Sequence, residues 1–375
     1  SHEAGRRAGR AVDEARQQVA KLVGAKSAEE ICFTSGASES NNLAILGSVG
    51  RGEGKRRHVI TVATEHASVL KPFRHLKEQG FEVSFLSVDR EGRIDLAELA
   101  ALVREDTALV SVMFCNNEIG VVQPLAEIAS LVRAKGALFH CDAAQGLGLL
   151  DLDVEAMGID LLSISGHKMY GPKGVGALYI RRPRARLSLQ PRSFGGSQED
   201  GLRPGTLDVS GIVGLGRAAE LMRVEGKAAA AEMRSLRERL WTTLKAALPE
   251  CELNGPGWAE RHPGNLHFSI PDIDGPTLMM RLPELAMSAG SACASASSTP
   301  MSHVLEAMGF SRSRASSSLR IGLGRASRAE ELEWAAQRLI EEVRALRSQR
   351  GAASAGLKRA KVAEGLARNE SAVGK

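Results

Sequence analysis

A chain of 375 residues exceeds a typical single domain, and with 43% hydrophobic residues and 39 glycines it predicts a two-domain α/β protein rich in tight turns. No membrane-length apolar run and no basic-then-apolar leader is present, so we expect neither a membrane partner nor a secretory signal, and a cytoplasmic, reducing compartment. The net charge of +5 arises in the Ala/Ser/Gly-rich segment 347–375, which carries seven Lys or Arg against two Glu, so we expect a basic disordered tail and no nucleic-acid partner.

The first elements alternate between helix and strand. Residues 5–23 place apolar side chains at helical spacing and predict an amphipathic helix. A short strand is expected at 30–33, followed by a turn over 34–42 in which a helix begins near Ser38. Such a turn favours an anion, because the free N–H groups and the helix dipole both attract a phosphate. Its glycine spacing matches no dinucleotide or Walker motif, so this signal alone is weak.

The next elements predict βαβ units and a mainly parallel sheet, with strands at 58–62, 82–88, 108–114 and 137–141. Polar residues follow several of these strands, namely His66, Asn116-Asn117-Glu118, and Asp142 to Gln145. The carboxyl ends of the strands in an open α/β sheet are where ligands bind. His66 alone, at a strand-to-helix corner, is compatible with a helix cap, a satisfied polar group or a catalytic residue.

The stretch 165–174 lies between two apolar runs that suit buried strands, so it is predicted to be a loop. Its Lys168 sits just after a buried strand, where desolvation disfavours the ammonium form. Such a lysine can form a Schiff base with a carbonyl substrate or with pyridoxal phosphate, and Ser165 and His167 could donate to a phosphate. The alternative is a surface lysine in a Gly-rich turn, and the stretch alone does not decide between them.

The second half begins with a turn-rich loop over 195–206 and a long helical region from about Val209 to Leu248. We expect the boundary between a large domain, 1–227, and a small domain, 228–346, inside that region. The small domain should alternate strand and helix at 266–270, 276–282, 301–308, 317–323 and 328–346.

Cysteines are scattered without metal-ligand or disulfide spacing, at positions 32, 115, 141, 251 and 293. The first three lie in strand-like runs and are expected to be inert core thiols. Cys293 lies in the small-residue stretch 288–299, which cannot pack a core and is expected to be a mobile loop. An accessible thiol in a reducing compartment is a liability unless it reacts on purpose.

Together these segments resemble the cysteine desulfurase family, pyridoxal phosphate enzymes of the class V aminotransferase group with the fold-type I architecture. The resemblance runs from Ser1 to about Leu346 and rests on ordered motifs: the 34–42 turn, Thr64-Glu65-His66, Asn116-Asn117-Glu118-Ile119-Gly120, Asp142 to Gln145, Ser165-Gly166-His167-Lys168, Ser291-Ala292-Cys293 and Ser318-Leu319-Arg320. It implies an α/β fold with a large, mainly parallel sheet domain that binds the cofactor and a smaller α/β C-terminal domain.

The resemblance also implies a role for each matching residue around pyridoxal 5'-phosphate. Lys168 resembles the lysine that holds the cofactor and moves the Cα proton of the substrate. Asp142 matches the carboxylate that pairs with the pyridine nitrogen. His66 matches the imidazole stacked on the ring and is a candidate acid–base group. Gln145 and Asn117 correspond to residues near the ring hydroxyl, and Asn117 also reaches the substrate.

The remaining roles concern the phosphate, the substrate and the sulfur. The phosphate is expected to contact the backbone of Ala37 and Ser38, the side chains of Ser165 and His167, and Thr206 from a second subunit of a homodimer. Arg320 matches the guanidinium that grips the carboxylate of L-cysteine. Cys293 matches the thiol that takes the sulfur and leaves alanine and a persulfide. No resident metal is expected, although Cys293 is a candidate transient ligand of an iron–sulfur cluster.

The implied activity is sulfur transfer to an acceptor or iron–sulfur scaffold protein, for iron–sulfur cluster or other sulfur-cofactor biosynthesis. Family members begin some tens of residues earlier, with an Asp-x-Ala-Thr-Thr segment, so the resemblance implies that such a segment precedes Ser1. A sequence that targets an organelle would also lie there. Two alternatives remain open: a selenocysteine lyase, which shares almost every residue named, and a catalytically inactive scaffold of the same fold.

Overall fold

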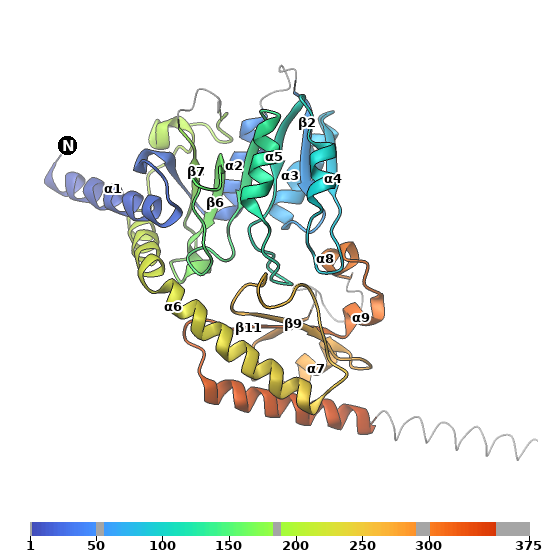
Figure 1. The fold of residues 1–375 in the computed structure, drawn as a ribbon. Coiled ribbons are helices and arrows are strands. Elements are labelled where there is room, and N and C mark those ends of the chain that lie inside the picture. The colour runs from blue at the N-terminus through green and yellow to red at the C-terminus, as the bar shows by residue number, and fades with distance from the viewer. Residues whose placement is uncertain (1, 50–55, 183–188, 290–300, 350–375) are drawn as a thin grey trace, which may run out of the picture.

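The computed structural model describes residues 2–49, 56–182, 189–289 and 301–349. Over these residues the chain forms a seven-stranded and a four-stranded sheet, joined by one long helix (Figure 1). The large sheet has the order β1-β7-β6-β5-β4-β2-β3. Its strands are β1 (Ile31–Thr34), β2 (His58–Val62), β3 (Glu82–Leu86), β4 (Thr107–Ser111), β5 (Leu138–Asp142), β6 (Leu161–Ser165) and β7 (Gly176–Ile180).

The predicted mainly parallel sheet is confirmed. Strands β2 to β6 pair in parallel, whereas β7 runs antiparallel to both of its neighbours, β1 and β6. The reversal follows from the short connection 166–175, because a parallel crossover needs a dozen or more residues, usually an α-helix. Every residue of β2, β6 and β7 is buried, as expected of strands covered on both faces.

Helices cover both faces of the large sheet. Side chains of α1 (Glu3–Val23), α5 (Leu125–Ala134) and the first half of α6 (Val209–Ala247) share one hydrophobic cluster. On the other face, α2 (Ala37–Ser48) and α3 (Ala67–Glu78) pack against a separate cluster (Figure 1). The short α4 (Leu96–Leu102) adds Leu99 to the first cluster.

The smaller sheet is antiparallel and has the order β10-β11-β9-β8. Its strands are β8 (Glu252–Leu253), β9 (Asn265–Ser269), β10 (Met287–Ala289) and β11 (Ser318–Gly322), and its helices are α7 (Gly275–Arg281), α8 (His303–Ala307), α9 (Arg312–Ser316) and a C-terminal helix over 329–349. Along α6, Met233 still belongs to the core of the large sheet, and Leu236 already belongs to the second core.

Two expectations need correction. The stretch 288–299 does not begin as a loop, because Ser288 and Ala289 belong to β10 and pair with β11. The remainder of the expected loop, 290–299 with Cys293, lies outside the described residues. The last helix continues past Leu346 to residue 349, and Arg347 forms an ion pair with Glu250, so the segment after Leu346 starts as packed helix. Residues 350–375 are also outside the described part.

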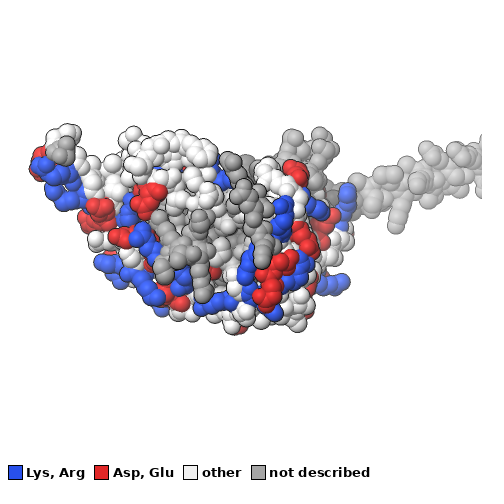
Figure 2. All heavy atoms as spheres, turned by 90° about the horizontal axis from the view of Figure 1, so that it is seen from above, with Lys and Arg blue, Asp and Glu red and all other residues white. Residues whose placement is uncertain are grey.

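The surface mixes charges of both signs. On the face in Figure 2, Lys and Arg side chains are interspersed with Asp and Glu over the described residues. Of the helices in the described part of the chain, none has the length and apolar character that crossing a membrane requires.

Candidate active site

A cavity of about 510 Å³ opens at the carboxyl ends of the parallel strands, where ligands bind in open α/β sheets. Segments far apart in the sequence contribute its lining: the start of α2, the turn before α3, and the segments after β4, β5 and β6. The residues predicted for the site that line it are Ala37, Ser38, His66, Asn117, Asp142, Gln145, Ser165, His167 and Lys168. Most of the predicted site is therefore brought together in one volume.

Lys168 lies in the 3₁₀ helix η2 (Gly166–Met169), directly after buried β6. The expected loop is thus a helical turn. A Cβ at Gly166 would lie 2.9 Å from the Val175 carbonyl oxygen, so glycine is needed where the chain folds back. Burial, together with the charge of Arg320, lowers the pKa of Lys168. The turn therefore delivers an amine whose neutral form is favoured relative to a lysine in water.

Asp142 ends β5 and is buried. Its Oδ1 accepts from the backbone N–H of Ala144 at 2.9 Å, and its Oδ2 accepts from Asn41 Nδ2 at 2.7 Å. Burial raises the pKa of Asp142, and these two hydrogen bonds oppose that rise by favouring the ionised form. Sequence reasoning missed Asn41, although it lies within the 34–42 motif.

The start of α2 has the features of an anion site. Its N-cap is Gly36, with φ 146°, and no side chain caps the helix, which leaves its first N–H groups facing the cavity. On the opposite wall Ser165 Oγ and His167 Nδ1 lie 3.1 Å apart. Burial, followed by the charges of Lys168 and Lys173, lowers the pKa of His167. Lys173, the His167 ring and the free N–H groups at the start of α2 therefore line the same cavity.

His66 is a helix cap, one of the roles left open by the sequence, and it also lies at the cavity. It is the N-cap of α3, where its Nδ1 accepts from the backbone N–H of Ser68 at 3.2 Å. Its side chain also lines the cavity. The hydrogen bonds at Nδ1 fix the ring relative to the helix, so a group in the cavity would meet an imidazole of defined orientation.

Two predicted residues in the described part of the chain, Arg320 and Thr206, do not line the cavity. Arg320 lies on β11, where it donates to Ser288 Oγ at 3.0 Å and to the carbonyl oxygen of Asn117. It therefore contacts the loop that carries Asn117 instead of the cavity. Thr206 is exposed and absent from the lining. Cys293 lies outside the described residues.

The four described cysteines, Cys32, Cys115, Cys141 and Cys251, are buried. The first three are in the core, as predicted from their strand-like surroundings. Cys115 also borders the cavity, but burial raises the pKa of its thiol to about 12, which disfavours the reactive thiolate.

The donors and acceptors of this cavity fit pyridoxal 5'-phosphate. The uncapped α2 N-terminus suits a phosphate, buried Asp142 suits a protonated ring nitrogen, and Lys168 suits an aldehyde. All three line one cavity.

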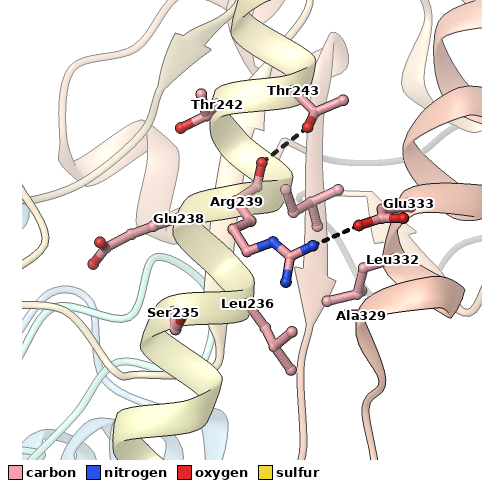
Figure 3. Close-up of a pocket in the computed structure, with 10 residues that line it drawn as sticks. Ser235, Leu236, Glu238, Arg239, Thr242, Thr243, Ala329, Leu332 and Glu333 are labelled. Atoms are coloured by element: carbon pink, nitrogen blue, oxygen red, sulfur yellow. Dashed lines mark hydrogen bonds and ion pairs between the residues drawn. The ribbon is translucent and has the colours of Figure 1, made fainter.

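A second hollow of about 430 Å³ lies between α6 and the C-terminal helix (Figure 3). The ion pair between Arg239 and Glu333 joins its two sides, and Thr243 Oγ1 donates back to the Arg239 carbonyl oxygen. Among the described residues that line it there is no Lys, Cys, His or Asp. The first cavity, by contrast, is lined by Lys168, Asp142 and two His side chains.

The fold and the site define a class V aminotransferase, and the family model described as "Aminotransferase class-V" matches residues 1–334. A cysteine desulfurase IscS from Anaeromyxobacter sp. (strain Fw109-5) is 53% identical over 348 residues, covering 92% of this chain and 85% of the relative. One from Salmonella schwarzengrund (strain CVM19633) is 46% identical over 347 residues, with the same coverage. This chain belongs to the cysteine desulfurase family.

Solved structures agree with this assignment. A NifS-like protein superposes with a TM-score of 0.84 at 36% identity, covering 92% of this chain and 90% of that one. The protein SspA, solved in complex with cysteine, superposes with a TM-score of 0.76 at 36% identity, covering 87% and 90%.

Proposed function

We propose that this chain is a pyridoxal 5'-phosphate-dependent cysteine desulfurase that converts L-cysteine to L-alanine and passes the sulfur to an acceptor. The observation that carries the proposal is the cavity in which Lys168, Asp142 and the uncapped start of α2 face one volume. When bound, the cofactor supplies an electron sink for the charge left at Cα of the substrate. The site residues supply the remaining functions.

Lys168 Nζ would hold the cofactor and then move a proton at Cα, a task favoured by its lowered pKa. Asp142 would keep the ring nitrogen protonated, and the donors Asn41 and Ala144 support its ionised form. His66 would stack on the ring, in an orientation set by its hydrogen bonds at the start of α3. Gln145 would lie near the ring hydroxyl, as one of the polar groups of the lining.

The substrate would be held through its carboxylate by Arg320 and contacted by Asn117. The contact between the Arg320 guanidinium and the Asn117 backbone supports a joint role, because it links the two residues without any substrate. Arg320 would have to turn from this carbonyl toward the cavity. A bidentate carboxylate is a stronger partner for a guanidinium than a single carbonyl, which favours this exchange.

The sulfur would leave the substrate by transfer to the Cys293 thiol. Its thiolate attacks the sulfur of the substrate, the Cβ–S bond breaks as the S–S bond forms, and Cβ gains a proton to give alanine. The substrate's thiol proton balances that gain, so the products are alanine and a Cys293 persulfide and no external oxidant is needed. An acceptor or scaffold protein would then take the terminal sulfur.

The test is alanine formation from L-cysteine by the purified chain loaded with pyridoxal phosphate. We expect the Cys293→Ala variant to bind cofactor and substrate but to lose nearly all alanine production from cysteine. The buried Cys251 provides the control, and Cys251→Ala should retain the activity. Wild-type turnover of cysteine by Cys293→Ala would exclude Cys293 as the sulfur acceptor. Turnover of selenocysteine but not cysteine by the wild type would instead indicate a selenocysteine lyase.

We further propose that the active unit is a homodimer in which Thr206 reaches the partner's phosphate site. Thr206 is exposed and does not line the cavity of its own chain, which supports a role toward a second copy. Phe194, near the start of the same loop, is 83% exposed and offers apolar surface for burial. Sedimentation at decreasing protein concentration should show loss of cofactor as monomers form. Full cofactor occupancy in a monomer would contradict the proposal.

A further inference from the structure

Glu65, the residue before the cavity-lining His66, is completely buried. Its Oε1 accepts a hydrogen bond from the backbone N–H of Met113 at 2.7 Å. Its Oε2 has no partner among the described residues. A buried carboxylate with a single donor has lost most of its hydration without replacement, so its ionised form is strongly disfavoured.

The charged and titratable groups around Glu65 add to this effect. Asp142 and Cys141 on β5 both interact electrostatically with Glu65, and the Asp142 charge raises the pKa of Glu65 further above the value that burial already sets. His66 is its neighbour in the chain, and His303 from α8 donates through Nε2 to the Glu65 backbone oxygen at 2.9 Å. Among the described residues, neither imidazole forms a hydrogen bond or an ion pair with the Glu65 carboxyl.

The two carboxyl groups are held differently. Asp142 accepts from two donors, and Glu65 from one. Two neighbouring carboxylates in a dry site do not both ionise readily, and the proton goes to the group with fewer donors.

We infer that Glu65 is a neutral carboxylic acid in the folded protein, and that it is a positioning residue that joins the turn carrying His66 to the loop after β4. Its bond to Met113 connects these segments, and Asn116 Nδ2 makes a parallel connection to the Thr64 carbonyl oxygen at 3.0 Å. Asn117 follows in the same loop. A neutral Glu65 also leaves Asp142 as the ionised member of the pair. This last consequence rests on the role proposed for Asp142, whereas the protonation state of Glu65 does not.

The first test is the pH dependence of thermal unfolding of the cofactor-free chain. A Glu whose folded-state pKa is raised binds a proton that the unfolded chain has released above about pH 4.5, so it lowers stability progressively as the pH rises. Glu65→Gln removes this proton uptake and keeps an oxygen that can accept from Met113. The difference in unfolding midpoint, Glu65→Gln minus wild type, should therefore increase between about pH 5 and about pH 8.

Glu14→Gln, at an exposed position on α1, is the matched control, and its unfolding midpoint should follow that of wild type at every pH.

Glu65→Leu tests the positioning role, because it removes the charge and the acceptor together. It should lose protection of the Met113 amide against hydrogen exchange, and Glu65→Gln should restore that protection. Equal Met113 protection in wild type and Glu65→Leu would overturn the positioning role.

The second test detects the proton directly by infrared spectroscopy at neutral pH. Wild type minus Glu65→Gln should show the carbonyl stretch of a protonated carboxylic acid. The inference would be overturned if that difference spectrum showed a carboxylate signal and the unfolding midpoint of Glu65→Gln decreased relative to that of wild type as the pH rises. Loss of the protonated band in Asp142→Asn but not in Glu65→Gln would overturn it as well, by assigning the proton to Asp142. None of these readouts requires desulfurase activity, so the proposed function and this inference can fail separately.

Discussion

Replacing Arg261 should weaken the junction between the small sheet and the loop after Asn117. Arg261 is buried, and no carboxylate of the described residues pairs with it. Its guanidinium instead donates to uncharged oxygens at 2.6 to 3.0 Å: the carbonyls of Pro256, Ile119 and Asn254, and Asn265 Oδ1. Because Ile119 lies two residues after Asn117, this cluster holds the cavity loop against the second core.

The expected loss follows from two opposing effects. Each hydrogen bond from a charged donor contributes about 1.5 to 3 kcal/mol, and Arg261 makes five of them, by way of four oxygens. Burial of the guanidinium opposes folding by several kcal/mol, which Arg261→Met recovers. The variant leaves the oxygens without donors, so we expect a net destabilisation of about 3 kcal/mol and a fall in Tm of roughly 5 °C.

The assay is thermal unfolding, followed by calorimetry, of wild type, Arg261→Met and Arg261→Lys. Lysine places its donors at one atom and cannot span the acceptors, so Arg261→Lys should lose most of the same stability. Arg312→Met, at an exposed position, should unfold at the wild-type midpoint. If Arg261→Met unfolded at the same midpoint temperature as Arg312→Met, the carbonyl contacts would contribute no net stability and the reasoning would be refuted.

Three further outcomes are expected. Borohydride reduction of the loaded wild type followed by digestion should find pyridoxal phosphate on Lys168, and Lys168→Ala should carry no covalent label; a label on another lysine would contradict the assignment. His140 is buried between Ser111 Oγ and Ser163 Oγ, and burial lowers its pKa to about 3. Because the unfolded chain binds this proton at a higher pH than the folded protein, the free energy of unfolding should fall as the pH drops from about 6.5 to about 3. Replacing His140 by Gln should flatten that slope in calorimetric scans, and an unchanged slope would point to other groups. A Cβ at Gly226 would lie 1.9 Å from the Gly148 carbonyl oxygen, so Gly226→Ala should destabilise the fold by roughly 1 to 3 kcal/mol in chemical denaturation. Gly9 on α1 has open space around its Cβ position, so Gly9→Ala should not destabilise the fold. Identical denaturation curves for the two variants would refute the steric argument.

Much of the fold was predictable because the strands of the large sheet are short continuous apolar runs between turn residues. This pattern directly reflects burial on both faces, and it located β6 and the lysine that follows it. The gathering of Asp142, Asn117 and Lys168 followed from one general property, namely that strand ends of a parallel sheet share an edge. The domain limits at 227 and 346 stay predictions.

Other features depend on contacts that no local pattern contains. Ser288 and Ala289 look like loop residues, but pairing with β11 makes them a strand. The sequence around Arg320 does not reveal that its guanidinium contacts the Asn117 backbone. The complete burial of Glu65 was equally hidden, because a charged residue between Thr64 and His66 ordinarily lies at the surface.

The continuity of α6 has a consequence for how the molecule moves and melts. Its 39 residues form a rod of roughly 58 Å that is embedded in both hydrophobic cores, with the change from one to the other between Met233 and Leu236. Melting either end exposes apolar side chains while fraying a helix that the other core needs, so both cores should unfold in a single calorimetric transition. The same rod resists hinge bending, because rotating the small sheet against the large one would curve a continuous helix. Access to the cavity should therefore depend on local rearrangement of loops, with the two sheets keeping their relative orientation.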